Sequence, residues 1–239
     1  MKILVVNDDG IRAPGILALA KWATKLGEVT VVAPEVEQSC RSQSITLGRP
    51  VAVREVDLLP DVRAISVDST PADCVRYATV GLGETYDLVL SGINRGFNLG
   101  LDIEYSATVG AIYEAGARGL TCMAVSTAPD TPEGAVRHLD EVWEYFTAHR
   151  LLDRHFLYNV NIPANAKGVR ITRQGGNGYA DRFERVEGDF WRQCGDFVYI
   201  PDPASDYDLD TVLTGYISVC PMTLERTDLG VYHDLKRSL

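Results

Sequence analysis

Residues 1–10 read MKILVVNDDG, and this stretch decides the fold class. The short aliphatic run 3–6 predicts a strand that is buried on both faces, as strands of parallel sheets are. Asp8 and Asp9 follow at once, so two carboxylates lie just past the end of this strand. Ligands of open parallel sheets bind at that edge. The opening of the chain therefore predicts an α/β fold with a polar site behind its first strand.

Strand and helix signals alternate through the first part of the chain. Apolar residues recur at helical spacing over 14–26, with Pro14 suited to the first turn and Gly27 to the C-terminal stop. Thr70 followed by Pro71 predicts a helix start by the same logic. The further strands are expected at 29–33, 64–67, 87–90 and 123–126, and the further helices at 70–80, 108–118 and 132–150. This alternation predicts a parallel sheet with helices on both faces.

The chain changes character after residue 150. Strands are expected at 156–162, 169–172, 197–200 and 216–219, separated by loops that contain glycine and proline. No long helical pattern returns until the last few residues. We interpret residues 169–223 as a β-rich elaboration, with a protruding hairpin, of the kind that often carries subunit contacts. We accordingly divide the chain into a core at 1–165 and a C-terminal elaboration at 166–239 that takes part in oligomerisation.

Composition and charge narrow the class of partner. The 239 residues are 46% hydrophobic, which suffices for a sizeable core, and the net charge of -10 argues against nucleic acid as a specific partner. No apolar stretch approaches the roughly 18 residues of a membrane span. The five cysteines are scattered and the four histidines show no zinc spacing. We expect a cytoplasmic protein with reduced thiols and a small-molecule ligand, away from membranes.

Asp8 and Asp9 are the first candidates for chemistry. Adjacent carboxylates repel each other, and a bound divalent cation removes that repulsion. Oxygen ligands of this kind suit Mg²⁺, Mn²⁺ or Ca²⁺. The alternative is a turn with a helix cap, since aspartate and glycine are frequent in turns. The position just past a buried strand favours a metal site.

A second candidate is the segment SGINRGFNLG, residues 91–100, which follows the strand expected at 87–90. Its glycines allow backbone N–H groups to approach an anion closely. The amide oxygen of Asn94 is able to complete a shell of oxygen ligands, and Asn98 is able to donate to a phosphoryl oxygen. The spacing matches neither a P-loop nor a dinucleotide-binding fingerprint.

Two further segments carry hydroxyl groups near expected strand or helix ends. Ser106 and Thr108 precede a helix, where such side chains cap the helix, bind phosphate, or do both. The loop 38–44 is rich in hydroxyls and adds Arg41 as a cation. It offers another oxygen ligand, although a plain polar surface loop is the alternative.

Together these segments resemble the SurE family of survival-protein nucleotidases and acid phosphatases. N-D-D-G followed by S-G-I-N-x-G-x-N, in this order, is a highly specific combination. The resemblance rests on ILVVNDDGI (3–11), APGI (13–16), VVAP (31–34), the serine-rich loop 39–44, STPADCV (69–75), DLVLSGINRGFNLG (87–100), YSATVGA (105–111), NVNIP (159–163) and GYISVCPM (215–222).

The resemblance implies a fold, an activity and a set of site residues. The fold would be a Rossmann-like three-layer sandwich whose C-terminal β arm is exchanged between subunits to give homodimers or homotetramers. The activity would be hydrolysis of nucleoside 5′- and 3′-monophosphates with one Mg²⁺ or Mn²⁺ per subunit. The implied metal ligands are Asp8, Asp9, Ser39 and Asn94, with Asp8 and Asp9 also catalytic, and the expected phosphate or substrate contacts are Asn7, Asn98, Ser106 and Thr108.

Departures from the family pattern leave alternatives open. Ser39 is followed by Cys40 and Arg41 where the family commonly has glycine next, and Ala107 replaces a family glycine. The added side chains put substrate preference and rate in doubt but leave the implied ligands intact. Attack by water and an aspartyl-phosphate intermediate are both compatible with the sequence. The sequence is also compatible with a nucleotide-binding module that has lost catalysis. A glycosyl transferase is a further alternative, but the 91–100 segment argues against it.

Overall fold

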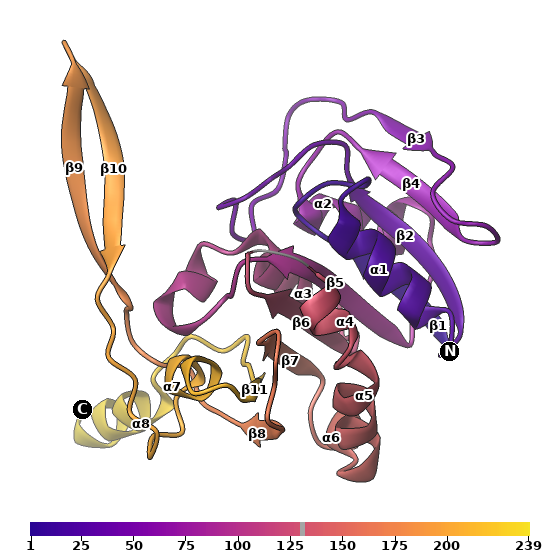
Figure 1. Cartoon of the computed structure of the whole chain (residues 1–239). Coiled ribbons are helices and arrows are strands. Elements are labelled where there is room, and N and C mark those ends of the chain that lie inside the picture. The colour runs from indigo at the N-terminus through magenta and orange to yellow at the C-terminus, as the bar shows by residue number, and fades with distance from the viewer. Residues whose placement is uncertain (130–131) are drawn as a thin grey trace.

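The structure is a computed structural model that describes residues 1–129 and 132–239. A mostly parallel sheet has the strand order β3-β4-β2-β1-β5-β6-β7-β11-β8, and a separate antiparallel pair is formed by β9 and β10 (Figure 1). The strands are β1 (Lys2–Val6), β2 (Glu28–Pro34), β3 (Val53–Glu55), β4 (Arg63–Val67), β5 (Leu88–Arg95), β6 (Cys122–Thr127), β7 (Leu157–Ile162), β8 (Val169–Ile171), β9 (Tyr179–Glu187), β10 (Phe190–Phe197) and β11 (Ile217–Pro221). The expected α/β fold class is confirmed.

Helices cover both faces of the large sheet. The α-helices are α1 (Pro14–Ala23), α2 (Pro71–Arg76), α3 (Ala107–Ala117), α4 (Glu133–Val136), α5 (Leu139–Ala148), α6 (Leu151–Arg154), α7 (Asp208–Leu213) and α8 (Leu229–Ser238), with a π-helical segment η1 (Tyr77–Gly81) and a 3₁₀ helix η2 (Gly100–Glu104). Alternate residues of β1 point to opposite faces. Ile3 packs into the core formed with α1 and α5, and Leu4 packs into the core formed with α2 and α3.

Three parallel strands bring the candidate segments to one edge of the sheet. β1 lies between β2 and β5, and Val6 pairs with Ser91 of β5. The segments that follow the carboxyl ends of these strands therefore meet: Asp8 and Asp9 after β1, the loop 35–52 after β2, and residues 96–99 after β5. This is the edge at which the sequence predicts the site.

Two sequence predictions in this region are wrong. The strand expected to end at residue 90 continues to Arg95, because β6 runs alongside and pairs with it as far as Thr127. The single helix expected at 132–150 is broken into α4 and α5. At the break, the Ala166 N–H donates to the Nε2 atom of His138. A contact with a residue so distant in the chain leaves no trace in the local periodicity.

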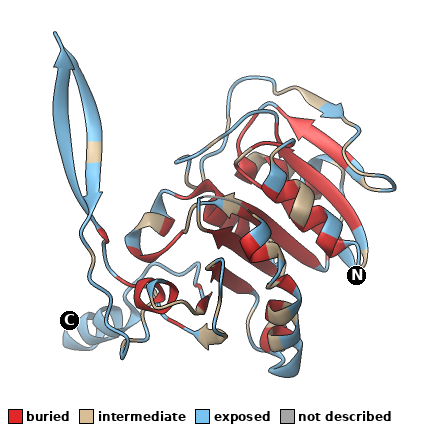
Figure 2. Ribbon diagram, viewed as in Figure 1, coloured by how far each residue is buried: buried red, intermediate tan, exposed pale blue. Residues whose placement is uncertain are grey.

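The C-terminal part divides between the large sheet and the hairpin. β11 pairs with β7 and β8 and so extends the large sheet. β9 and β10 instead rise from the body as a long hairpin, and Figure 2 shows that it is exposed nearly throughout. The strand expected at 197–200 is wrong, since β10 ends at Phe197. The sequence patterns did not reveal the short helix α7 within this β-rich part. Among the described residues, no helix has the length and apolar character needed to cross a membrane.

Candidate active site

Asp8 is a buried carboxyl group, and no positively charged side chain of the described residues pairs with it. It is 4% exposed, and the Thr108 hydroxyl donates to its Oδ1 atom at 2.5 Å. Burial raises the pKa of Asp8 to about 7, the Thr108 hydrogen bond opposes this rise, and the charge of Asp9 adds to it. A carboxylate in such a place costs free energy unless a cation accompanies it.

Asp9 lies next to this group and is only partly buried. The backbone N–H of Arg95 donates to its Oδ2 atom at 3.3 Å. Burial raises the pKa of Asp9, the Arg95 N–H lowers it, and the charge of Glu37 raises it further. Glu37 also accepts a hydrogen bond from the Ser39 hydroxyl at 2.7 Å. The sequence analysis missed Glu37, although its place after the β2 strand was a signal for it.

The end of β5 presents Asn94 in a defined orientation. The pairing with β6 shifts register between Gly92 and Asn94, and such a bulge redirects the side chain beside it. The backbones of β5 and β6 lie so close together here that residue 92 must be glycine, because a Cβ there would lie 2.2 Å from the carbonyl oxygen of Val125. The Asn94 side-chain N–H donates to the carbonyl oxygen of Gly96 at 2.8 Å. This hydrogen bond uses the amide nitrogen and leaves the Oδ1 atom as the acceptor with which Asn94 would bind a cation.

A cavity of about 550 Å³ lies at this edge, a size within the range of small-molecule sites. Of the residues singled out from the sequence, it is lined by Asp8, Ser39, Asn94, Asn98 and Ser106. A neighbouring cavity of about 350 Å³ is lined by Asp9 and Glu37 and shares Asn94 and Arg95 with the first. The structure thus places the four implied ligands around adjoining cavities.

The larger cavity also has walls that the sequence analysis missed. They include Phe97, Asp102, Tyr105 and, from the hairpin, Tyr179, Asp181 and Gln193. The hairpin residues come from a segment that was interpreted only as a subunit contact. Their contribution depends on the path of the chain between residues 163 and 179, which no local pattern specifies.

Asn98 is held by three residues of β6 and β7. Its backbone N–H donates to Asn161 Oδ1, and its carbonyl oxygen accepts from the side chains of Asn159 and Asn161, each at 2.9 Å. Its own side-chain N–H donates to the Ser126 hydroxyl at 2.8 Å. The other amide hydrogen of Asn98 has no acceptor among the described residues, so it is able to donate to a bound anion. The two asparagines of the NVNIP segment therefore support this residue, a role the sequence did not reveal.

Ser106, Thr108 and Asn7 differ in what they face. Ser106 lines the cavity and caps α3, since its hydroxyl accepts from the Val109 N–H. Thr108 is fully buried and turned to Asp8. Asn7 is fully buried too, and its side chain donates to the Gly10 carbonyl oxygen at 2.9 Å. Thr108 and Asn7 thus support the Asp8 turn, whereas Ser106 faces the space in which a phosphate would lie.

The donor set fits a hard divalent cation. Within residues 1–129 and 132–239, no group of three or more histidine, cysteine or acidic side chains is arranged to hold a metal. Ligation at this edge would therefore combine the carboxylates of Asp8 and Asp9 with the amide oxygen of Asn94 and the hydroxyl of Ser39. All four are oxygen donors, which suits Mg²⁺ or Mn²⁺ rather than a thiolate-preferring metal.

Comparisons with known proteins identify the family. Residues 3–181 match the family described as survival protein SurE. The chain is 39% identical over 241 residues to the 5′-nucleotidase SurE of Thermosipho melanesiensis, covering 95% of this chain and 93% of that protein. It is 39% identical to the 5′-nucleotidase SurE of Acinetobacter baumannii strain SDF, with 100% of both chains covered. The crystal structure of the SurE protein from Aquifex aeolicus aligns with a TM-score of 0.83 at 33% identity, covering 100% of this chain and 99% of that one. The resemblance found in the sequence is confirmed, and the chain belongs to the SurE family.

Proposed function

We propose that this chain is a hydrolase that cleaves nucleoside 5′- and 3′-monophosphates to nucleoside and phosphate with the help of a divalent cation. The observation that carries this proposal is Asp8, a carboxyl group 4% exposed that lines the cavity beside oxygen donors. Full-length similarity to proteins named 5′-nucleotidase SurE supports the same activity.

The proposed ligands are Asp8, Asp9, Ser39 and Asn94, with one Mg²⁺ or Mn²⁺ per subunit. A cation bound there supplies positive charge that offsets the charge developing on the phosphoryl oxygens. The chain keeps each ligand in place by a separate contact. Thr108 orients Asp8, the Arg95 N–H contacts Asp9, and Gly96 orients Asn94. The Ser39 hydroxyl donates to Glu37.

Two cavity residues have hydrogens left to donate to a phosphoryl group. The Ser106 hydroxyl accepts from Val109, and within residues 1–129 and 132–239 its own hydrogen has no acceptor. Asn98 uses one amide hydrogen for Ser126 and retains the other. Donors fixed in advance at the place where negative charge develops lower the barrier without reorganising. The aromatic residues Tyr105 and Tyr179 give the same cavity stacking surfaces for a nucleobase.

Two routes of attack are compatible with this geometry. In the first, Asp8 or Asp9 orients or deprotonates a water molecule that attacks phosphorus, and the nucleoside hydroxyl leaves. In the second, a carboxylate oxygen attacks phosphorus and breaks its bond to the nucleoside oxygen, which leaves as the protonated hydroxyl, and water then hydrolyses the acyl phosphate to carboxylate and phosphate. Rapid quenching during turnover separates them, because a phosphorylated peptide that contains Asp8 or Asp9 arises only in the second route.

The activity is tested by phosphate release from a panel of nucleoside 5′- and 3′-monophosphates with Mg²⁺, with Mn²⁺ and with EDTA. Release that depends on the metal and stops on adding EDTA supports the hydrolase and ranks its substrates. Folded protein that releases no phosphate with either metal, yet binds nucleotides, would instead be a binding module.

We further propose that the chain forms homodimers or homotetramers through its C-terminal β arm, residues 166–239, and acts in the cytoplasm. All nine residues of β9 are exposed, and no residue of α8 is buried. These elements carry large apolar side chains, among them Phe183, Phe190, Tyr232 and Leu235. Apolar groups gathered in this way mark interaction surfaces. All five cysteines are free thiols, which suits a reducing compartment.

A further inference from the structure

The loop 35–52, which carries Ser39, has no regular structure of its own to hold it. Cys40 and Ser42 adopt left-handed backbone conformations with φ of 57° and 52°. Such conformations cost non-glycine residues of the order of 1 kcal/mol or more each, and they persist only where surrounding contacts impose them. The position of Ser39 must therefore be imposed from outside the loop.

The loop is first held in place by its packing on helix α3. The carbonyl oxygen of Ser42 lies so close to Gly110 that a Cβ at residue 110 would be 2.2 Å from it. The Ser42 N–H and hydroxyl also donate to the carbonyl oxygens of Tyr105 and Glu104, which lead into this helix. Only glycine at position 110 permits the loop to lie at this depth.

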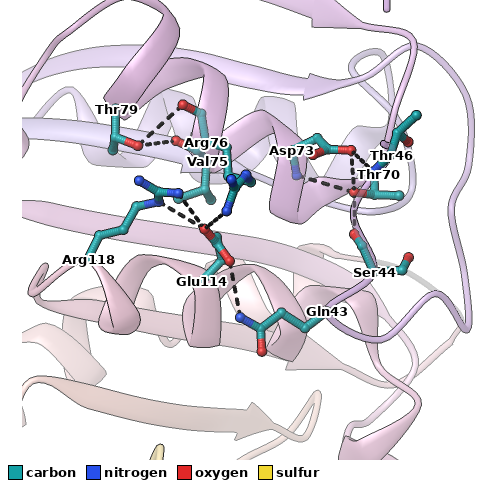
Figure 3. Close-up of polar contacts among 10 residues, drawn as sticks. All are labelled: Gln43, Ser44, Thr46, Thr70, Asp73, Val75, Arg76, Thr79, Glu114 and Arg118. Atoms are coloured by element: carbon teal, nitrogen blue, oxygen red, sulfur yellow. Dashed lines mark hydrogen bonds and ion pairs between the residues drawn. The ribbon is translucent and has the colours of Figure 1, made fainter. Parts of the chain in front are cut away.

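A second contact lies further along the same helix (Figure 3). Glu114 is 6% exposed, and its Oε1 atom pairs with Arg76 of α2 and with Arg118. Its Oε2 atom accepts a hydrogen bond from the Gln43 side chain of the loop at 3.2 Å. The two guanidinium groups offset the cost of burying the carboxylate and fix its orientation. Glu114 is thus a rigid anchor to which the loop is attached.

Helix α2 secures the far end of the loop. The Thr70 hydroxyl donates to the Ser44 carbonyl oxygen at 2.6 Å, and the Thr46 N–H donates to Asp73 at 2.7 Å (Figure 3). These contacts lie several residues beyond Ser39. Before Ser39, the Gln38 N–H donates to the Asp8 carbonyl oxygen at 2.7 Å. After Ser39, the nearest contacts are those that Ser42 and Gln43 make with α3 and with the residues that lead into it.

The same helix α3 also holds Asp8, since Thr108 donates to it. The eleven-residue helix α3 therefore contacts both Asp8 and the Ser39 loop. Residue 108 contacts Asp8, and residues 110 and 114 contact the loop. We infer that α3 holds the part of the loop after Ser39 in place relative to Asp8, and that Gly110, Gln43 and Glu114 are positioning residues that raise the metal affinity of the site without touching the metal.

The inference rests on the proposed metal site, and it makes no claim about the chemical step. Groups behind the ligands of a metal typically change its affinity by about 10- to 100-fold when they are altered. Because none of the three residues meets substrate or metal, the loss should be overcome by raising the metal concentration. Affinity for metal should fall, whereas kcat at saturating metal should stay near that of the wild type.

The test compares two alanine substitutions in α3 by calorimetric titration of the protein with Mn²⁺. Gly110→Ala and Gly116→Ala add the same methyl group to the same helix and raise its helix propensity equally. At residue 116 the nearest atom to the new Cβ is a side-chain atom of Phe156 at 3.2 Å, whereas at residue 110 it is backbone. We expect Gly110→Ala to weaken Mn²⁺ binding about 10-fold or more and Gly116→Ala to leave it unchanged.

A second series covers the case in which Gly110→Ala does not fold. Gln43 is partly exposed, so Gln43→Ala and Gln43→Glu should fold normally. Loss of one hydrogen bond should weaken Mn²⁺ binding about 2- to 10-fold in Gln43→Ala. Gln43→Glu should weaken it further, because the new carboxylate faces Glu114. Thermal unfolding of the metal-free variants serves as the measure of stability.

The outcomes separate this inference from the proposed metal site. A wild-type protein that binds no Mn²⁺ overturns both. If the wild type binds Mn²⁺ and both the Gly110 and the Gln43 variants match its affinity, only the role of α3 is overturned. An equal loss in Gly110→Ala and Gly116→Ala also overturns it, since the effect would then belong to the helix in general.

Discussion

The first strand of the large sheet and the β9–β10 hairpin use apolar residues in opposite ways. Residues 3–6 of β1 are completely buried between helices on both faces. In β9 every residue is exposed, and in β10 all but one are, although these strands contain Phe183, Phe190 and Trp191 (Figure 2). The large sheet is stabilised by its own chain, whereas the hairpin offers an apolar surface that one chain alone does not cover.

The hairpin is nevertheless ordered along its length by cross-strand contacts. Tyr179 and Phe197 pack edge to face with ring centroids 5.2 Å apart. On the opposite side, Arg182 pairs with Glu184 and Asp196. Alternate residues thus give an aromatic face and a charged face. The base of the aromatic face reaches the active-site cavity through Tyr179, while its outer part is available for a second subunit.

The largest effect is expected at the sheet edge, from Asp9→Ala. Loss of this proposed ligand and catalytic carboxylate should lower metal-dependent phosphate release by about 10²-fold or more. The fold should persist, because removing Asp9 relieves repulsion on Asp8. Asp87→Ala is the control, since Asp87 contacts the Lys2 N–H at the start of β1, away from the site. Asp9→Ala protein with wild-type turnover in the presence of a chelator would refute the assigned role.

Replacing a buried phenylalanine of the core and an exposed phenylalanine of the hairpin by alanine, one at a time, tests the contrast in burial directly. Phe146 is 1% exposed and packs on Tyr158, whereas Phe190 is 75% exposed. Phe146→Ala should lower the free energy of unfolding by about 3–5 kcal/mol. Phe190→Ala should change it by about 0.5 kcal/mol or less when measured by urea denaturation at a concentration where the protein is monomeric. Equal losses at the two positions would mean that the hairpin is part of the core.

The hairpin should matter for assembly instead. Replacing Phe183 and Trp191 together by serine removes apolar surface from two exposed hairpin residues that do not line the cavity. We expect light scattering coupled to size exclusion to show a shift from oligomer to monomer, with the thermal unfolding of the monomer little changed. An oligomer of wild-type size would place the subunit contact elsewhere, for example on α8.

The smallest effect is expected from an exposed contact between α1 and α5. Hydrogen bonds from Lys25 and Trp22 lower the pKa of Asp140 below its ordinary value of 3.8. A lowered native pKa contributes stability above pH 3.8 that is lost as the pH falls through the native pKa. Asp140→Asn should therefore reduce Tm slightly at pH 7, and the difference from wild type should shrink below pH 3.8 in thermal scans. A difference that stays constant over this range would assign the effect to packing.

Much of the site was predictable because the signals are local. A short aliphatic run, two carboxylates and a segment with glycines and asparagines each follow a strand, and parallel strands bring such ends together. The structure accordingly places Asp8, Ser39 and Asn94 around one cavity. Glu37 also follows a strand, but it was missed because its effect on the pKa of Asp8 and Asp9 arises only where the fold brings the three carboxylates together.

The sequence by itself determined the α/β class, the edge of the sheet that bears the site, and the family. It did so because periodicity, turn residues and specific motifs depend only on nearby positions. Tertiary structure alone decided that Thr108 serves Asp8, that Gly110 and Glu114 hold the Ser39 loop, and that the hairpin base joins the cavity. These are contacts between residues far apart in the chain, and they exist only when packing has brought the segments together.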